Sequence, residues 1–200
     1  MRDQLERFAI IGLGNPGREY EHTRHNIGFM AIDQLSRAWD IPVNKFRFTS
    51  LVGQGKFDGQ PIILAKPQNF MNRSGEAVAS IARFYKLSPQ QICIIHDDLD
   101  LRFGNIRLRY SGGSAGQKGM ASIIKSLGTE EFCRLRIGIG RPPGRMEAAD
   151  YVLQPFRKAE FEIVENVLQK AVGAIEMLLK DGVERAMTSF NHSESNDQQT

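Results

Sequence analysis

The sequence predicts an α/β fold: a single domain in which helices flank a mixed, mostly parallel and twisted β-sheet. Short apolar runs that suit buried strands alternate along the chain with segments whose apolar residues recur every three or four positions, as on one face of a helix. The length of 200 residues, with 41% hydrophobic and 24% charged residues, matches one globular core, because single cores grow to roughly 250 residues.

The first strand and the first helix are expected near the N-terminus. Residues 7–13 form a short apolar run that ends in glycines, which is typical of a buried strand that leads into a loop. From Asn26 onward, apolar residues recur at helical spacing until Pro42, which ends the predicted helix.

A hairpin and a second helix follow. Residues 46–57 and 61–65 flank Asp58-Gly59, and this pair predicts a turn between two antiparallel strands because glycine tolerates positive φ. Residues 74–86 again carry apolar side chains at helical spacing, so a second helix is expected there.

The second half of the chain continues the alternation. Residues 92–95 resemble a buried strand that runs directly into the polar segment 96–100, and open α/β sheets bind ligands at such carboxyl ends. The remaining expected elements are a strand over 106–110, a glycine-rich loop over 111–119 that opens a helix at about Met120, a strand over 134–140 and a closing helix within 156–179. The domain is expected to span 1–192, followed by a flexible polar tail over 193–200.

Composition narrows the class of protein. No apolar run approaches the roughly 20 residues that a membrane helix needs, and the N-terminus carries no signal-peptide pattern, so a cytoplasmic protein without a membrane partner is expected. Cys93 and Cys133 both lie in strand-like runs, which predicts buried reduced thiols and excludes a disulfide framework.

Positive charge is concentrated in one part of the sequence. The formal net charge of +3 is too small to indicate a nucleic-acid partner by itself. Residues 101–129, however, contain five basic and no acidic side chains, and four arginines follow by residue 145. This basic stripe consists of Arg102, Arg107, Arg109, Lys118, Lys125, Arg134, Arg136, Arg141 and Arg145. It favours a phosphate-bearing partner, with a solvated charged face as the alternative.

A glycine motif follows the first predicted strand. Gly12, Gly14 and Gly17 fit the spacing of dinucleotide-binding turns. That fold requires a helix to begin inside the motif, whereas the predicted helix begins about ten residues later, and the acidic candidate Asp33 falls inside this helix. A nucleotide-dependent oxidoreductase is therefore disfavoured, and a turn that only redirects the chain stays open.

Two further polar segments could carry chemistry. His22 and His25 could contribute to a metal site with residues 96–100, but no third His or Cys stands at ligand spacing. The favoured interpretation is a metal-free acid–base pair, in which a carboxylate at one strand end orients an imidazole at another. Amides within 66–75 could hold a carbonyl or simply cap a helix, and the glycine-rich loop could bind an anion or act as a flexible lid.

Three segments together resemble bacterial-type peptidyl-tRNA hydrolases. They are residues 12–28, which contain GLGNPG and then TRHN; residues 66–75, which read KPQNFMNRSG; and residues 96–104, which read HDDLDLRFG. The resemblance covers nearly the whole chain in order. It implies hydrolysis of the ester that joins a peptide to the 3′-terminal ribose of tRNA, by a monomer that needs neither metal nor cofactor and whose partner is peptidyl-tRNA.

The resemblance also assigns roles to individual residues. His25 would activate water and Asp97 would orient it, in agreement with the acid–base pair favoured above. Asn15 and Asn72 would position the substrate's terminal peptide and its carbonyl, and Tyr20 and Met71 would lie beside them as further substrate-binding residues.

The glycine-rich loop departs from the family's commonest pattern. Where that pattern has His-Asn, this sequence has Gln117-Lys118, so Lys118 would reach a phosphate or the 3′ end as a point charge. Arg109 and Arg136 match basic positions that face the tRNA phosphates. The same departure leaves open a non-catalytic RNA-binding relative, such as a scaffold or a splicing-type factor, although intact His25 and Asp97 argue against it.

Overall fold

The structure is a computed structural model that describes residues 6–191. Its centre is a seven-stranded sheet with the order β2-β3-β4-β1-β5-β7-β6. Strands β4, β1, β5 and β7 are parallel, whereas β2 and β3 on one side and β6 on the other run antiparallel to their neighbours. The strands are β1 (Phe8–Gly12), β2 (Lys45–Arg47), β3 (Ser50–Phe57), β4 (Gln60–Pro67), β5 (Ile92–Asp98), β6 (Ile106–Arg109) and β7 (Cys133–Gly138).

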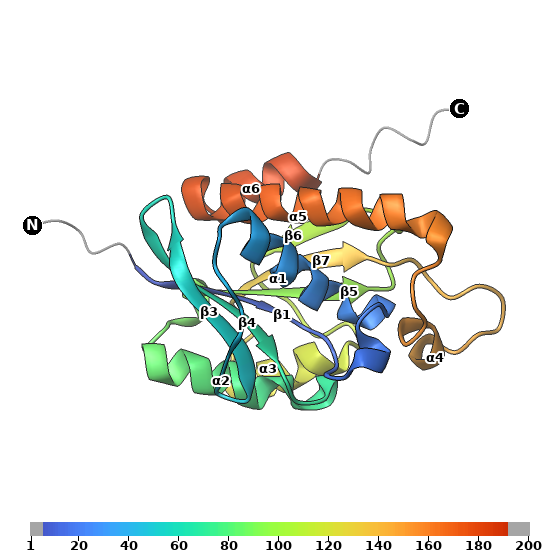
Figure 1. The fold of residues 1–200 in the computed structure, drawn as a ribbon, viewed down its shortest axis with the longest axis horizontal. Coiled ribbons are helices and arrows are strands. Elements are labelled where there is room, and N and C mark those ends of the chain that lie inside the picture. Colours follow the sequence, from blue (N-terminus) through green and yellow to red (C-terminus); the bar gives the residue numbers. More distant parts are fainter. Residues whose placement is uncertain (1–5, 192–200) are drawn as a thin grey trace, which may run out of the picture.

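Helices cover both faces of the sheet. Helices α1, α5 and α6 lie over one face and α2 and α3 over the other, whereas α4 stands apart at one end of the sheet (Figure 1). The helices are α1 (Ile27–Ala38), α2 (Ser74–Tyr85), α3 (Lys118–Leu127), α4 (Ala148–Val152), α5 (Phe161–Asp181) and α6 (Val183–Asn191). Short 3-10 segments are η1 (Arg18–Tyr20), η2 (Arg24–Asn26), η3 (Met71–Arg73), η4 (Pro89–Gln91) and η5 (Lys158–Glu160). The predicted α/β class with a mixed sheet is confirmed.

The alternation of side chains along the strands divides the core in two. In β1, Ile10 packs with α1 and α5, whereas Ala9 and Ile11 pack with α2 and α3. Cys93 and Cys133 stand opposite each other in β5 and β7 and are both buried and free. Burial raises the pKa of the Cys93 thiol well above its ordinary value, so this cysteine is not an activated nucleophile.

Several predicted element boundaries were wrong. The strand expected over 46–57 is interrupted by a tight turn in which Phe48 and Thr49 both have positive φ, and this turn separates β2 from β3. The closing helix begins at Phe161 rather than Phe156, after η5. It ends at Asp181, and the φ of 86° at Gly182 allows the chain to turn into α6, a helix that the sequence analysis did not predict.

The glycine motif permits close packing at the start of α1. A Cβ atom on Gly12 would lie 2.1 Å from the carbonyl oxygen of Gly28, and one on Gly28 would lie 2.5 Å from that of Ile95. Helix α1 can therefore rest directly on the ends of β1 and β5. No helix begins inside the motif, which agrees with the turn interpretation and not with a dinucleotide site.

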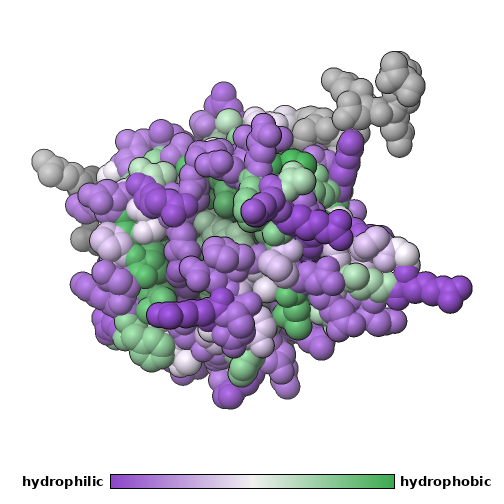
Figure 2. Space-filling model, turned by 45° about the vertical axis from the view of Figure 1, so that its right-hand side comes forward, coloured by the Kyte–Doolittle hydropathy of each residue, from purple (hydrophilic) through white to green (hydrophobic). Residues whose placement is uncertain are grey.

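One face of the molecule is shown in space-filling form in Figure 2. The face shown in Figure 2 is mostly hydrophilic, with small apolar patches between the polar side chains. Within residues 6–191, no helix is both long and apolar enough to cross a membrane. The predicted tail over 193–200 and the boundary at 192 lie outside the described residues.

Candidate active site

A cavity of about 1130 Å³ opens where the central strands end. Its walls come from the segments that follow β1 and β4, from the last residues of β5, from the glycine-rich loop before α3 and from the region around α4. These segments are far apart in sequence, and the parallel strands bring their carboxyl ends together. The cavity therefore lies where α/β sheets usually bind ligands.

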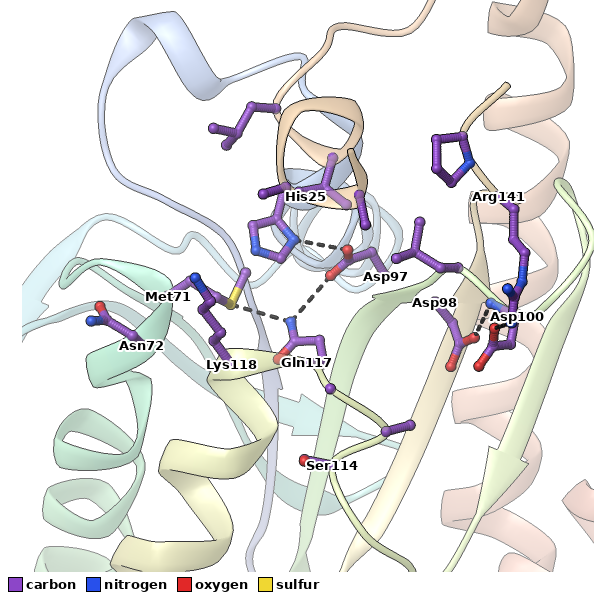
Figure 3. A pocket seen from close by; sticks show the side chains of 18 of the residues that line it. His25, Met71, Asn72, Asp97, Asp98, Asp100, Ser114, Gln117, Lys118 and Arg141 are labelled. Carbon is purple, nitrogen blue, oxygen red and sulfur yellow. Dashed lines mark hydrogen bonds and ion pairs between the residues drawn. The ribbon is translucent and has the colours of Figure 1, made fainter. Parts of the chain in front are cut away.

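His25 and Asp97 meet in this cavity (Figure 3). The Nδ1 atom of His25 lies 2.8 Å from Oδ2 of Asp97, and the two side chains are 13% and 3% exposed. The carboxylate accepts a hydrogen bond from Nδ1–H, so the neutral imidazole carries its lone pair on Nε2. The sequence analysis predicted this pair, and its members are 72 residues apart in the chain.

A second buried network fixes Asn15. The side chain of Asn26 accepts from the backbone N–H of Asn15 and donates to its carbonyl, both at 2.9 Å. The Oδ1 atom of Asn15 accepts from the backbone N–H of Met71, also at 2.9 Å. Because Oδ1 is engaged, the Nδ2 amino group of Asn15 is its remaining donor. Asn26 was missed by the sequence analysis, since its neighbour His25 had the more obvious chemistry.

The segment after β4 supplies another amide. Met71 is buried and Asn72 is exposed, and both line the cavity. The alternative that Asn72 caps a helix is not supported, because no side-chain cap is present at η3 or α2 and Ser74 Oγ instead donates to the Met71 carbonyl. Asn72 therefore lines the cavity without capping either helix.

The glycine-rich loop places two side chains at the cavity. Lys118, at the start of α3, is exposed and lines the wall, and its contact with substrate stays a prediction. Gln117 caps α3 through its Oε1, which accepts from the Met120 N–H at 2.7 Å. Its Nε2 lies 3.1 Å from Oδ1 of Asp97. The sequence analysis treated Gln117 only as a departure from a pattern and missed this contact.

Tyr20 does not line the cavity. It ends η1, and its carbonyl accepts the hydroxyl of Thr23 at 2.8 Å. Its predicted place beside the substrate therefore finds no support in this geometry.

Four arginines of the basic stripe share one face of the sheet edge. Arg107 stands opposite Arg136, and Arg109 opposite Arg134, in the antiparallel pair of β6 and β7. Their neighbour Leu108 belongs to the core on the α1 and α5 side, so the arginines project from the other face.

These arginines differ in their exposure and in their hydrogen bonds within the protein. Arg109 is exposed at the end of β6. Arg134 is buried and donates to the carbonyls of Gly113 and Glu130. Arg136 is 15% exposed and donates through Nε to Oδ2 of Asp98 at 2.5 Å. Arg109 is thus the more accessible of the two predicted phosphate contacts.

The residues on either side of Asp97, His96 and Asp98, both have shifted pKa values. Burial alone would raise the pKa of the Asp98 carboxyl, but the hydrogen bond and charge of Arg136 outweigh it and hold the pKa below its ordinary value. Burial lowers the pKa of His96, whose Nδ1 lies 2.7 Å from the Asp97 carbonyl oxygen. Among the described residues, no group of three or more His, Cys, Asp or Glu side chains could hold a metal ion.

Comparison with known proteins gives a consistent result. A family model described as peptidyl-tRNA hydrolase matches residues 9–199. A peptidyl-tRNA hydrolase from Carboxydothermus hydrogenoformans is 52% identical over 92% of this chain and 98% of its own length. One from Brevibacillus brevis is 48% identical, with coverage of 92% and 97%. A crystal structure of the enzyme from Acinetobacter baumannii, 35% identical, superposes with a TM-score of 0.87 over 92% of this chain and 94% of that one.

Proposed function

The chain belongs to the peptidyl-tRNA hydrolase family, and from that premise we propose that His25 and Asp97 activate the water that cleaves the ester between the peptide and the 3′-terminal ribose of peptidyl-tRNA, which releases tRNA for reuse. The observation that carries this proposal is the 2.8 Å contact between the two side chains inside the cavity. This contact, together with Asn15 and Asn72 at the same cavity, favours hydrolysis over a non-catalytic RNA-binding function.

The first step is the activation of water. Asp97 accepts a hydrogen bond from Nδ1–H of His25, so Nε2 is free of a proton. It can therefore take a proton from a water molecule as the oxygen attacks the ester carbonyl carbon. Asp97 also stabilises the imidazolium that forms. Because the carboxylate is 3% exposed, little bulk water weakens this interaction.

The second step is the collapse of the tetrahedral intermediate. The attacking oxygen gives the carbonyl oxygen a negative charge, which amide N–H groups of Asn15 and Asn72 can stabilise. The C–O bond to the ribose then breaks, and the leaving 3′ oxygen takes the proton from Nε2 of His25. The peptide leaves as a carboxylic acid that loses its proton to solvent, and the imidazole returns to its neutral form.

The basic stripe would hold the tRNA beside the cavity. Arg109 is exposed, Arg136 is 15% exposed and paired with Asp98, and Lys118 lines the cavity wall. Such side chains contact phosphates of an RNA helix by charge and shape, without reading sequence. Monomeric state and cytoplasmic location stay predictions.

The proposal is tested by replacing His25 with Ala. We expect the release of peptide from an N-blocked aminoacyl-tRNA to fall by about 100- to 10,000-fold, the usual contribution of a positioned base, while binding of the deacylated tRNA is retained. Undiminished turnover in the His25→Ala variant would remove the assigned base.

A further inference from the structure

We propose that Gln117 is a positioning residue that fixes the Asp97 carboxylate for His25 through a neutral amide donor. This inference rests on the function proposed above. It assigns to the glycine-rich loop a role in the chemistry of the base, in addition to any contact that the loop makes with substrate.

The two oxygens of Asp97 have different partners. Oδ2 contacts Nδ1 of His25 at 2.8 Å, and Oδ1 accepts from Nε2 of Gln117 at 3.1 Å (Figure 3). The carboxylate is buried, so it depends on protein donors to replace the water it has lost. Two donors on two oxygens fix both the position of the carboxylate and the rotation of its plane. Without Gln117, the Oδ1 atom would lose this donor and the plane would be fixed less firmly.

The orientation of the Gln117 amide is set by the start of α3. Its Oε1 accepts from the backbone N–H of Met120 at 2.7 Å, so the opposite end must present the amino group to Asp97. The same Nε2 lies 3.3 Å from Sδ of Met71. The amide therefore joins the helix, the segment after β4 and the carboxylate.

The neutral character of the amide has a chemical consequence. Gln117 donates to ionised Asp97 but cannot lose or gain a proton at the pH values where imidazole titrates. A carboxylate in its place would repel Asp97 and would favour the protonated form of His25, which cannot act as a base. The side chain at position 117 therefore affects the pH range of activity.

The substitution Gln117→Glu separates this role from the helix cap. A glutamate keeps an oxygen for the Met120 N–H and so keeps the cap, but it removes the donor to Asp97 and adds a charge. Gln91→Glu is the matched control, because the Oε1 atom of Gln91 accepts from the Ser88 N–H at 2.8 Å, outside the cavity. Gln117→His is a rescue variant that restores a donor.

The experiment measures kcat and KM for an N-blocked aminoacyl-tRNA across roughly pH 5 to 9, with thermal unfolding as the check on folding. For Gln117→Glu we expect kcat to fall by about 10- to 100-fold, the range for losing one hydrogen bond to a charged group. KM should change little, and the acid limb of the profile should move to higher pH. Gln117→His should recover part of kcat, and Gln91→Glu should match the wild type.

Two results would overturn the inference. One is a Gln117→Glu variant with the kcat and pH profile of an active wild type. The other is an NMR titration in which the His25 ring titrates at the same pH in Gln117→Glu and in the wild type. The titration needs no substrate, so it judges Gln117 even if the wild type releases no peptide, a result that would instead contradict the proposed function.

Discussion

At the scale of single residues, the site depends on buried polar groups that hydrogen-bond to one another and to the backbone. Asp97 has a partner on each oxygen, and Asn26 makes two hydrogen bonds to the backbone of Asn15. Such networks are costly when one member is lost, because the remaining group stays buried without a partner. We therefore expect the buried polar residues to control both stability and activity.

His96 predicts a pH dependence of stability. Burial lowers its pKa in the folded protein, so below the ordinary value of 6.5 the unfolded chain binds a proton that the folded chain does not. Unfolding then takes up protons, and the free energy of unfolding falls as the pH decreases through this window. We expect His96→Asn, whose amide can replace Nδ1 as a donor, to show a smaller loss of stability between about pH 7.5 and 5.5.

Urea unfolding at the two pH values measures this effect. His22→Asn is the control, because His22 is exposed and its replacement should leave the wild-type dependence unchanged. Equal slopes for His96→Asn and the wild type would show that the buried imidazole does not contribute.

At the scale of elements, η2 is held in place by the contacts of Arg24 with Glu160, Tyr151 and Phe156, together called the Arg24 latch. Arg24 is 3% exposed, and its Nη2 donates to both carboxylate oxygens of Glu160 at 2.9 Å. Its guanidinium also stacks on the rings of Tyr151 and Phe156, with centroids at 4.7 and 4.8 Å. Since His25 follows Arg24 directly, the latch ties the proposed base to the segment between α4 and α5.

Removing the acid of this latch should destabilise the protein. In Glu160→Ala, Arg24 becomes a buried charge without its partner, and we expect a loss of about 2–5 kcal/mol in the free energy of unfolding. The control is Glu76→Ala, which breaks the exposed pair with Arg73 and should have little effect. A similar small effect for Glu160→Ala would contradict the latch.

The contribution of Glu160 should also depend on pH. Burial alone would raise the pKa of its carboxyl, but hydrogen bonds from Arg24 and the Arg157 N–H outweigh it and hold the pKa below the ordinary value of 4.5. A lowered folded pKa means that this stabilisation is complete above that ordinary value and is lost as the pH falls through the folded pKa. The difference between Glu160→Ala and the wild type should therefore shrink in acid.

The sequence predicted elements better than their ends. Periodicity located α1, α2 and the central strands, because burial of one face is a property of the segment itself. It could not locate the turn at Phe48 and Thr49 or the break before α6, which depend on local backbone angles and on packing against β6. The polar run after residue 95 was read as a strand end, whereas β5 continues to Asp98.

The sequence likewise predicted some residues of the site and missed others. His25 and Asp97 were predictable because their chemistry is typical of an acid–base pair and their motifs are specific. Asn26 and Gln117 were not, because their role is defined by partners that are 11 and 20 residues away in sequence. The sequence analysis also did not predict the pairing of Arg136 with Asp98, because it considered Arg136 only as part of the basic stripe.

At the scale of the whole molecule, the arginine face formed by β6 and β7 predicts salt-sensitive binding of tRNA. Each phosphate contact releases counterions from RNA, so we expect Arg109→Ala to raise KM and to reduce the slope of log affinity against log salt by up to about 1, with kcat unchanged. Titration of tRNA at several salt concentrations measures the slope. The control is Arg37→Ala, an exposed position on α1. An Arg109→Ala slope equal to that of the wild type would exclude this residue from the tRNA surface.

The whole account depends on an imidazole from η2 and a carboxylate from β5 acting as one unit. The most direct test is the rate of peptide release by Asp97→Asn, which keeps the shape of the side chain but replaces the carboxylate by a neutral amide that cannot stabilise the imidazolium by charge. The account predicts a fall in kcat of about 100- to 10,000-fold with tRNA affinity unchanged. Wild-type turnover in this variant would contradict it.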